Sequence, residues 1–131
     1  MIASTNLEVR ALFRAPCPIV RFNALVAGRH KLRILWELRD GPKRYSAIQR
    51  ALVDASGGGP ITPRVLSREL RELCATGLST RKQFPGVPPR VEYTMSADGR
   101  ALLDVMRSIC CWGETAAKPR LRRSNRQGLL R

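Results

Sequence analysis

The chain has 131 residues, 44% of them hydrophobic, which suffices for one compact domain but not for two. Its 24 Lys and Arg residues against 10 Asp and Glu residues give a formal net charge of +14. This excess favours a polyanionic partner, with nucleic acid as the leading candidate, an anionic membrane surface as the other, and a purely solubilising charge as the plain alternative.

The amino-terminal part of the chain predicts an arm followed by a central helix. Residues 1–16 form the arm, with a short helix at 7–13 that Cys17-Pro18 interrupts, because proline cannot donate a hydrogen bond inside a helix. Residues 22–38 are strongly apolar and predict one largely buried helix. The turn residues Asp40-Gly41-Pro42 end it.

Capping signals predict the next two helices. Ser46 begins a capping-box pattern, Ser-Ala-Ile-Gln, that opens a short helix. Residues 53–60 contain three consecutive glycines and predict a loop. Thr62 as N-cap and Pro63 at the first helical position then open a helix to about residue 75, with Gly77 suited to its C-terminal turn.

The last part of the domain predicts a hairpin and a helix. Strand-like runs at 78–84 and 91–95 flank a proline-rich tip, and Ser96 caps a helix to about residue 114. The order of helix, helix, helix, hairpin, helix is that of a winged helix-turn-helix. We therefore expect a mainly α fold with a small β-hairpin over residues 17–116, followed by a basic, disordered tail at 117–131.

The helix that begins after Thr62 carries the sharpest functional signal. At ~100° per residue its leucines fall in one sector and its arginines in the opposite one. An outward row of arginines is typical of a recognition helix that contacts guanines or phosphates, whereas an ordinary solvated face with Arg–Glu pairs, such as Arg68 with Glu72, is the alternative. A strand that leads into the first helix of the motif, and the hairpin, add further cations suited to phosphates or the minor groove, although any solvated loop is charged. The predicted DNA-binding residues are Lys43, Arg44, Ser46, Thr62, Arg64, Ser67, Arg68, Arg71, Arg81, Lys82 and Arg90.

Six stretches along the chain resemble one known family. They are Cys17-Pro18, KLRILWEL at 31–38, GPKRY at 41–45, RELREL at 68–73, VPPRVEY at 87–93 and CWGE at 111–114. In these stretches the chain is similar to the HxlR-type regulators, and VPPRVEY is the most specific of them. The chain departs from the family at Ala27-Gly28-Arg29-His30, where the family has Gly-Gly-Lys-Trp. It also has a longer loop at 53–60, which bears on the angle between the two helices of the motif.

The resemblance implies a winged-helix homodimer that is held by its first and last helices and regulates nearby genes from a pseudo-palindromic duplex site. The dimer contacts expected on the last helix are Leu102, Val105, Met106, Ile109 and Trp112. The resemblance also implies that Cys17 senses oxidants or electrophiles as a thiolate, which the nearby Arg14 and Arg21 would favour. A buried cysteine that packs as a small hydrophobe is the alternative. A small-molecule effector between the dimer helices is compatible with this interpretation.

Other functions have less support in the sequence. No secretory signal opens the chain and no apolar run reaches a membrane span, so we expect a cytoplasmic protein with no membrane partner. Four cysteines without CxxC spacing and one histidine predict no metal and no cofactor. His30 lies at a helix start with no nucleophile motif nearby, so we expect that the protein is not an enzyme. The remaining rival is a nucleoid-type or RNA-binding protein that uses its charge, including the basic tail, without sequence preference.

Overall fold

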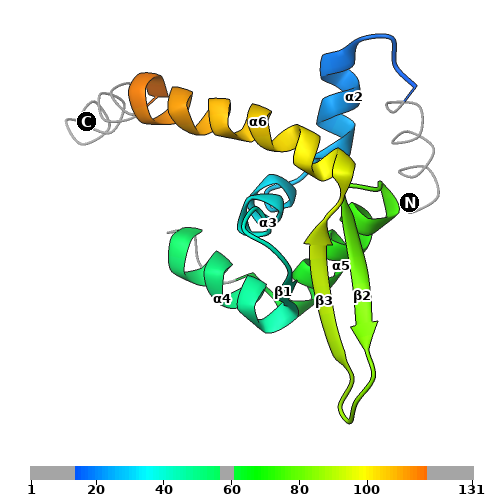
Figure 1. Ribbon diagram of the computed structural model, residues 1–131. Coiled ribbons are helices and arrows are strands. Elements are labelled where there is room, and N and C mark those ends of the chain that lie inside the picture. Colours follow the sequence, from blue (N-terminus) through cyan, green and yellow to red (C-terminus); the bar gives the residue numbers. More distant parts are fainter. Residues whose placement is uncertain (1–13, 57–60, 118–131) are drawn as a thin grey trace.

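The computed structural model describes residues 14–56 and 61–117 (Figure 1). The expected helix at 7–13 and nearly all of the basic tail lie outside these residues. The elements, in chain order, are α2 (Pro18–Leu25), α3 (Lys31–Glu37), β1 (Lys43–Arg44), α4 (Tyr45–Ser56), α5 (Pro63–Ala75), β2 (Ser79–Phe84), β3 (Arg90–Met95), α6 (Ala97–Trp112) and the π-helical turn η1 (Gly113–Ala117). None of the helices in the described residues has the length and apolar character needed to cross a bilayer.

The strands form one small antiparallel sheet in the order β1-β3-β2. β2 and β3 are the two arms of a hairpin, from the pair Ser79 and Met95 at its base to the pair Phe84 and Arg90 near its tip. The short β1 adds to the other edge of β3, where Lys43 pairs with Tyr93. The expected mainly α fold with a small hairpin, and the strand leading into the first helix of the motif, are both confirmed.

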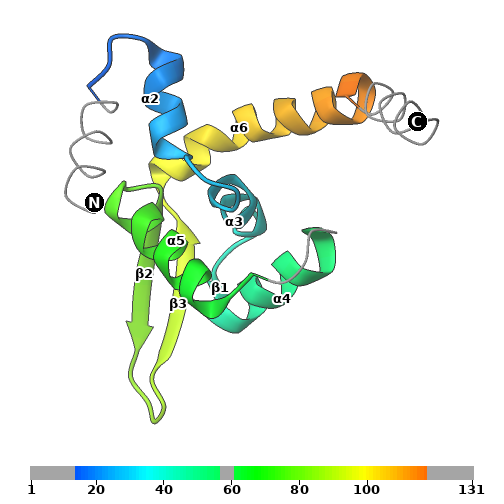
Figure 2. The same cartoon turned by 180° about the vertical axis from the view of Figure 1, so that it is seen from behind.

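The core lies where α3, α4 and α5 meet beneath α6 (Figures 1 and 2). Its fully buried side chains come from α3, from the turn that follows it, from α4 and from α5: Ile34, Leu35, Leu38, Ile48, Leu66, Leu70 and Leu73. In both views the hairpin extends away from this core on one side, and the far end of α6 projects past α3 on another. The hairpin and the far end of α6 therefore belong to separate surfaces of the molecule.

The single helix expected at 22–38 is wrong, because the segment forms two helices. Gly28 has φ +109°, a left-handed conformation that breaks the helix and that glycine adopts without strain. α3 restarts after His30, whose carbonyl accepts from the Ile34 N–H at 2.8 Å, so the prediction of His30 as a helix-start residue is confirmed. Pro18 occupies the first turn of α2, where its missing N–H costs little, and the expected helix before it lies outside the described residues.

α4 begins two residues earlier and ends later than expected. β1 passes directly into the helix at Tyr45, so Ser46 lies inside the first turn and is not the N-cap. The expected loop at 53–60 is also wrong in its first half, since α4 continues to Ser56. Residues 53–56 contain neither glycine nor proline, so nothing in them stops the helix. The glycines of this loop lie outside the described residues.

The predicted caps of the last two helices are confirmed. The Thr62 hydroxyl accepts from the Val65 N–H at 3.3 Å, with Pro63 at the first position of α5. Ser96 caps α6 by accepting from the Gly99 N–H at 3.1 Å, and its hydroxyl also donates to the Gly77 carbonyl at 2.5 Å. The second contact ties the start of α6 to the turn between α5 and β2.

Candidate nucleic-acid interface

α5 has one buried and one exposed face, as its spacing predicts. Leu66, Leu70 and Leu73 are fully buried against the core. Four of the predicted DNA-binding side chains, Arg64, Ser67, Arg68 and Arg71, are all exposed. Burial of the leucines sets the rotation of the helix about its axis and therefore aims the arginines at solvent. Thr62 is exposed as well, but its hydroxyl already accepts the capping hydrogen bond.

A tyrosine joins the two helices of the motif. The Tyr45 hydroxyl, at the start of α4, donates to the Pro63 carbonyl at the start of α5 at 3.0 Å. The Ser67 hydroxyl in turn donates to the Tyr45 oxygen at 3.4 Å. This link fixes where the two helices meet, although the loop between them is long. The Ser67 hydroxyl is therefore already used in a hydrogen bond within the protein.

A buried ion cluster joins α3 to the inner side of α5. The Lys31 ammonium, 7% exposed, lies 2.6 Å from Glu69 Oε2 and 2.5 Å from Glu72 Oε2, and it donates to the Ala27 carbonyl at 2.9 Å. Burial alone would lower the pKa of Lys31, but its contacts with the two carboxylates, and their charges, raise that pKa above its ordinary value. Lys31 therefore stays charged inside the protein.

The pairing of Arg68 with Glu72, which their spacing allows, is not formed. Glu72 binds Lys31, and Arg68 Nη2 lies 3.4 Å from Glu69 Oε1. The Lys31 side chain reaches between the two glutamates from α3, and no pattern within α5 indicates this. The Arg68 side chain is nevertheless 58% exposed.

The cations that precede α4 have different surroundings. Lys43 Nζ lies 3.4 Å from Glu37 Oε2, and Glu37 also binds Arg33 at 2.6 Å. Arg44 and Ser46 are exposed, whereas Lys43 is half-buried. The charge of Lys43 is therefore partly satisfied inside the protein.

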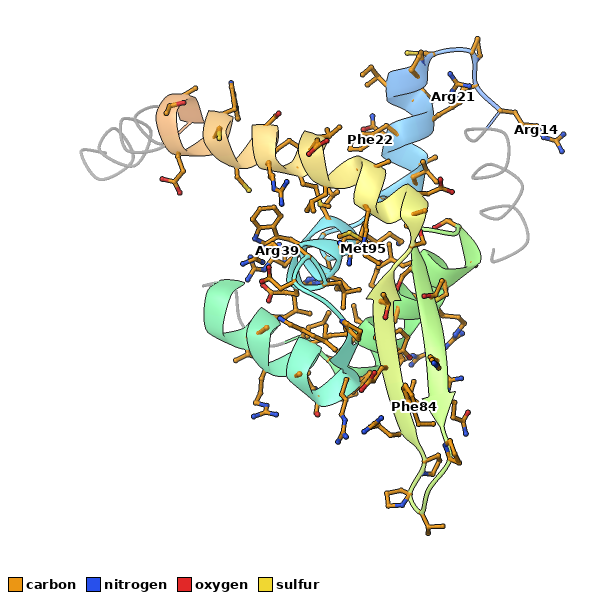
Figure 3. All side chains as sticks on the ribbon, viewed as in Figure 1. Arg14, Arg21, Phe22, Arg39, Phe84 and Met95 are labelled. Carbon is orange, nitrogen blue, oxygen red and sulfur yellow. The ribbon has the colours of Figure 1, made fainter. Side chains whose placement is uncertain are left out.

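Two cations of the hairpin lie against an aromatic ring. The Arg90 guanidinium lies 4.3 Å and Lys82 Nζ 4.9 Å from the centre of the Phe84 ring, near the tip (Figure 3). Arg90 also contacts Glu92 at 3.5 Å. Arg81, next to Lys82 along β2, points to the opposite face of the sheet because side chains alternate along a strand. The sequence-based prediction missed this role of Phe84, although its two-residue spacing from Lys82 indicates a shared face.

Cys17 is exposed at the N-cap position of α2. Within a single chain it therefore does not pack as a small buried hydrophobe, which was the alternative. The backbone N–H groups of Val20 and Ile19 lower the pKa of its thiol, and the charge of Arg21 adds to this effect. Figure 3 shows Arg14 directed away from α2. Burial instead raises the pKa of Cys74, which is half-buried at the end of α5.

The residues expected at a dimer interface are of two kinds. Met106 is buried in the chain's own core, and Leu102 packs partly against that core. Val105, Ile109 and Trp112 are 47%, 45% and 61% exposed along α6, and Ile19 on α2 is 67% exposed. Large apolar side chains exposed in a row are typical of a surface that another chain covers.

Comparison with known proteins identifies relatives of this chain. A family model described as HxlR-like helix-turn-helix matches residues 25–121. An uncharacterised HTH-type transcriptional regulator of Methanothermobacter thermautotrophicus is 38% identical over 89 residues, which are 68% of this chain and 63% of that relative. The HTH-type transcriptional regulator YkvN of Bacillus subtilis is 37% identical over 89 residues, 68% of this chain and 70% of that protein.

Solved structures agree with the sequence relatives. The oxidised redox regulator HypR is 32% identical, with a TM-score of 0.66 over 76% of this chain and 96% of that one. The reduced transcriptional regulator YodB from B. subtilis is 27% identical, with a TM-score of 0.64 over 80% of this chain and 98% of that one.

Proposed function

The chain belongs to the HxlR-like helix-turn-helix family of transcriptional regulators, and from this premise we propose that two copies pair and bind a pseudo-palindromic duplex site through α5 and the hairpin. The observation that carries the proposal is the two-sided α5. Its leucines are fully buried, so Arg64, Arg68 and Arg71 face solvent from a rigidly held helix.

The other cations have supporting roles in this proposal. Arg81, Lys82 and Arg90 on the hairpin contact phosphates or the minor groove beside α5. Arg44 and Ser46 contact a phosphate at the start of α4, and Lys43 contributes less because it is shared with Glu37. Thr62 and Ser67 act mainly through the structure, by capping α5 and by holding Tyr45.

The proposed dimer uses the exposed apolar side chains of α6 together with α2. Val105, Ile109 and Trp112 would be covered by the partner copy, with Leu102 at the edge of the contact. In a two-fold dimer the two α5 helices would enter successive major grooves about 34 Å apart, which explains why a pseudo-palindromic site is expected.

A binding measurement tests the proposal. Full-length protein is titrated onto its own upstream intergenic DNA and onto a scrambled duplex of equal length, at about 150 mM salt to weaken non-specific contacts. We expect a preference of about 10³-fold or more for a specific site. Equal affinities for the intergenic and scrambled duplexes, and for every sequence recovered in a genome-wide selection, would instead identify a charge-driven DNA coater.

We further propose that Cys17 makes the regulator responsive to electrophiles. The thiolate adds to the β-carbon of an electrophile such as an α,β-unsaturated carbonyl compound: an S–C bond forms, the C=C π bond breaks, and water protonates the resulting enolate. The added group then lies at the start of α2 beside the proposed dimer contact. Support comes from the exposure and lowered pKa of Cys17 and from the likeness to HypR, a redox regulator. Alkylation of Cys17 that leaves operator affinity unchanged would contradict this role.

A further inference from the structure

Lys31 is one cation among 24 in the sequence, yet its ammonium is enclosed. It faces two carboxylates of α5 and one carbonyl of the turn between α2 and α3. Glu69 Oε2 is buried without an aligned hydrogen-bond donor, so it meets Lys31 as a charge contact. The Gly28 turn also lies against this cluster, because a Cβ built there would be 3.5 Å from Glu69 Oε1.

The same two glutamates are neighbours of the exposed arginine face. Glu69 follows Arg68 directly, and Arg68 Nη2 is already 3.4 Å from Glu69 Oε1. Glu72 lies four residues after Arg68, a spacing at which opposite charges pair on a helix. Its side chain is 48% exposed and therefore free to turn outward. Among the described residues, it is the contact with Lys31 that draws its carboxylate toward α3.

We propose that Lys31 is a positioning residue for DNA binding: it holds Glu69 and Glu72 on the inner side of α5, so that Arg68 remains available to DNA phosphates. Without the ammonium, Glu72 would take Arg68 as its partner. In the structure Arg68 shares Glu69 with Lys31, which neutralises that carboxylate, whereas a full pair with Glu72 would oppose the release of counterions from the duplex and so reduce the contribution of Arg68 to binding. This inference rests on the proposed contact of α5 with DNA.

The salt dependence of binding distinguishes this role from a structural one. A variant that is merely less stable has fewer active molecules, but each active molecule makes the same phosphate contacts. The logarithm of the affinity falls linearly with the logarithm of the salt concentration. Loss of one phosphate contact per protomer makes this slope shallower by about one unit per protomer. The measurement uses a labelled duplex of arbitrary sequence between about 50 and 200 mM salt, because non-specific binding is itself made of phosphate contacts.

A mutant cycle isolates the effect of Glu72. The four proteins are wild type, Glu72→Gln, the double variant K31M/E69Q and the triple variant K31M/E69Q/E72Q. Lys31 and Glu69 change together so that no unpaired charge remains buried. We expect the slope of wild type and of Glu72→Gln to agree. We expect K31M/E69Q to lose about one unit per protomer and the triple variant to recover it.

The outcomes separate this inference from the proposed function. An equal effect of Glu72→Gln in both backgrounds, or no effect in either, would overturn the role of Lys31 while leaving DNA binding intact. Absence of any salt-dependent duplex binding by the wild type would overturn both. Lys31→Arg keeps the charge and is expected to retain the wild-type slope even if it is less stable. A reduced slope in that variant would overturn the role of Lys31 on its own.

Discussion

Arg68 and Arg71 lie on the same face of α5, and each is expected to contribute directly to DNA binding. Arg68→Ala and Arg71→Ala should each weaken specific binding by about 1–3 kcal/mol, because a guanidinium fork that pairs with a base edge or a phosphate is lost. Titration of the operator duplex by fluorescence anisotropy measures the change. Arg100→Ala is the matched control, since Arg100 is an exposed arginine on α6 and outside α5 and the hairpin. Unchanged affinity in both α5 variants would contradict the recognition role of this helix.

The four cysteines should differ in reactivity according to their surroundings. A lowered pKa means that Cys17 forms its thiolate at lower pH, so its alkylation by iodoacetamide should reach half of its maximal rate below pH 9.0, the ordinary value. Cys74 should react last near neutral pH, because burial raises its pKa and limits access. Peptide mass spectrometry over a pH series follows each site separately. Faster labelling of Cys74 than of Cys17 would contradict the assigned environments.

At the scale of single residues, the sequence predicts exposure better than pairing. The spacing in α5 correctly separates leucines from arginines. It does not reveal that Glu72 binds Lys31, because that contact depends on how α3 packs on α5. It also does not distinguish Lys31, which is buried, from Arg29, which is exposed two residues earlier. Both belong to one basic stretch, but Arg29 lies in the turn before α3, whereas Lys31 is the first residue of that helix.

At the scale of elements, Gly99 joins α6 to the base of the hairpin. A Cβ at this position would lie 2.2 Å from the Leu78 carbonyl oxygen and 2.7 Å from the Met95 side chain. Gly99→Ala should therefore lower the free energy of unfolding by about 1–3 kcal/mol, since backbone must move. Urea denaturation measures this change in the free energy of unfolding.

Gly113→Ala is the control for this change. Gly113 ends α6 in a helical conformation with nothing within 4 Å of a built Cβ, so alanine there should be neutral or slightly stabilising. Equal stability of the two alanine variants would show that α6 does not approach the hairpin as closely as described.

The success of the element predictions follows from local chemistry. Thr62-Pro63 and Ser96 satisfy backbone N–H groups within their own turn, so their effect can be predicted without the fold. The break at Gly28 is different. The apolar pattern continues on both sides of it, so the pattern alone does not indicate that Gly28 takes a left-handed conformation. An unbroken helix was therefore the wrong inference from a continuous pattern.

At the scale of the whole molecule, the exposed side of α6 should hold the proposed dimer together. Trp112→Ser should give a folded monomer, because Trp112 is 61% exposed and contributes no contact to the core cluster. Light scattering at micromolar concentration measures the mass, and far-ultraviolet circular dichroism verifies the helices.

Met106→Ala provides the contrast on the same helix. Met106 is buried, so its truncation should lower the free energy of unfolding by about 2–5 kcal/mol. A Trp112→Ser protein that still has the mass of a dimer would place the interface elsewhere.

The architecture as a whole could be predicted because each element has its own signal and the order of elements is distinctive. The small third strand, β1, was expected only as a lead into α4, and its pairing with β3 is a tertiary contact. The predicted interface on α6 mixed inward and outward residues, because helical spacing groups Met106 with Ile109 without showing which of them meets the chain's own core.

The projecting end of α6 also bears on how such regulators diversify after gene duplication. The core contacts of α6 within the described residues end at Met106, so later positions can change without unfolding the domain. Paralogues in one cell could thus acquire incompatible pairing surfaces while keeping the same recognition helix. Substitutions at a few exposed positions would then prevent mixed dimers, and each regulator would act only on its own genes.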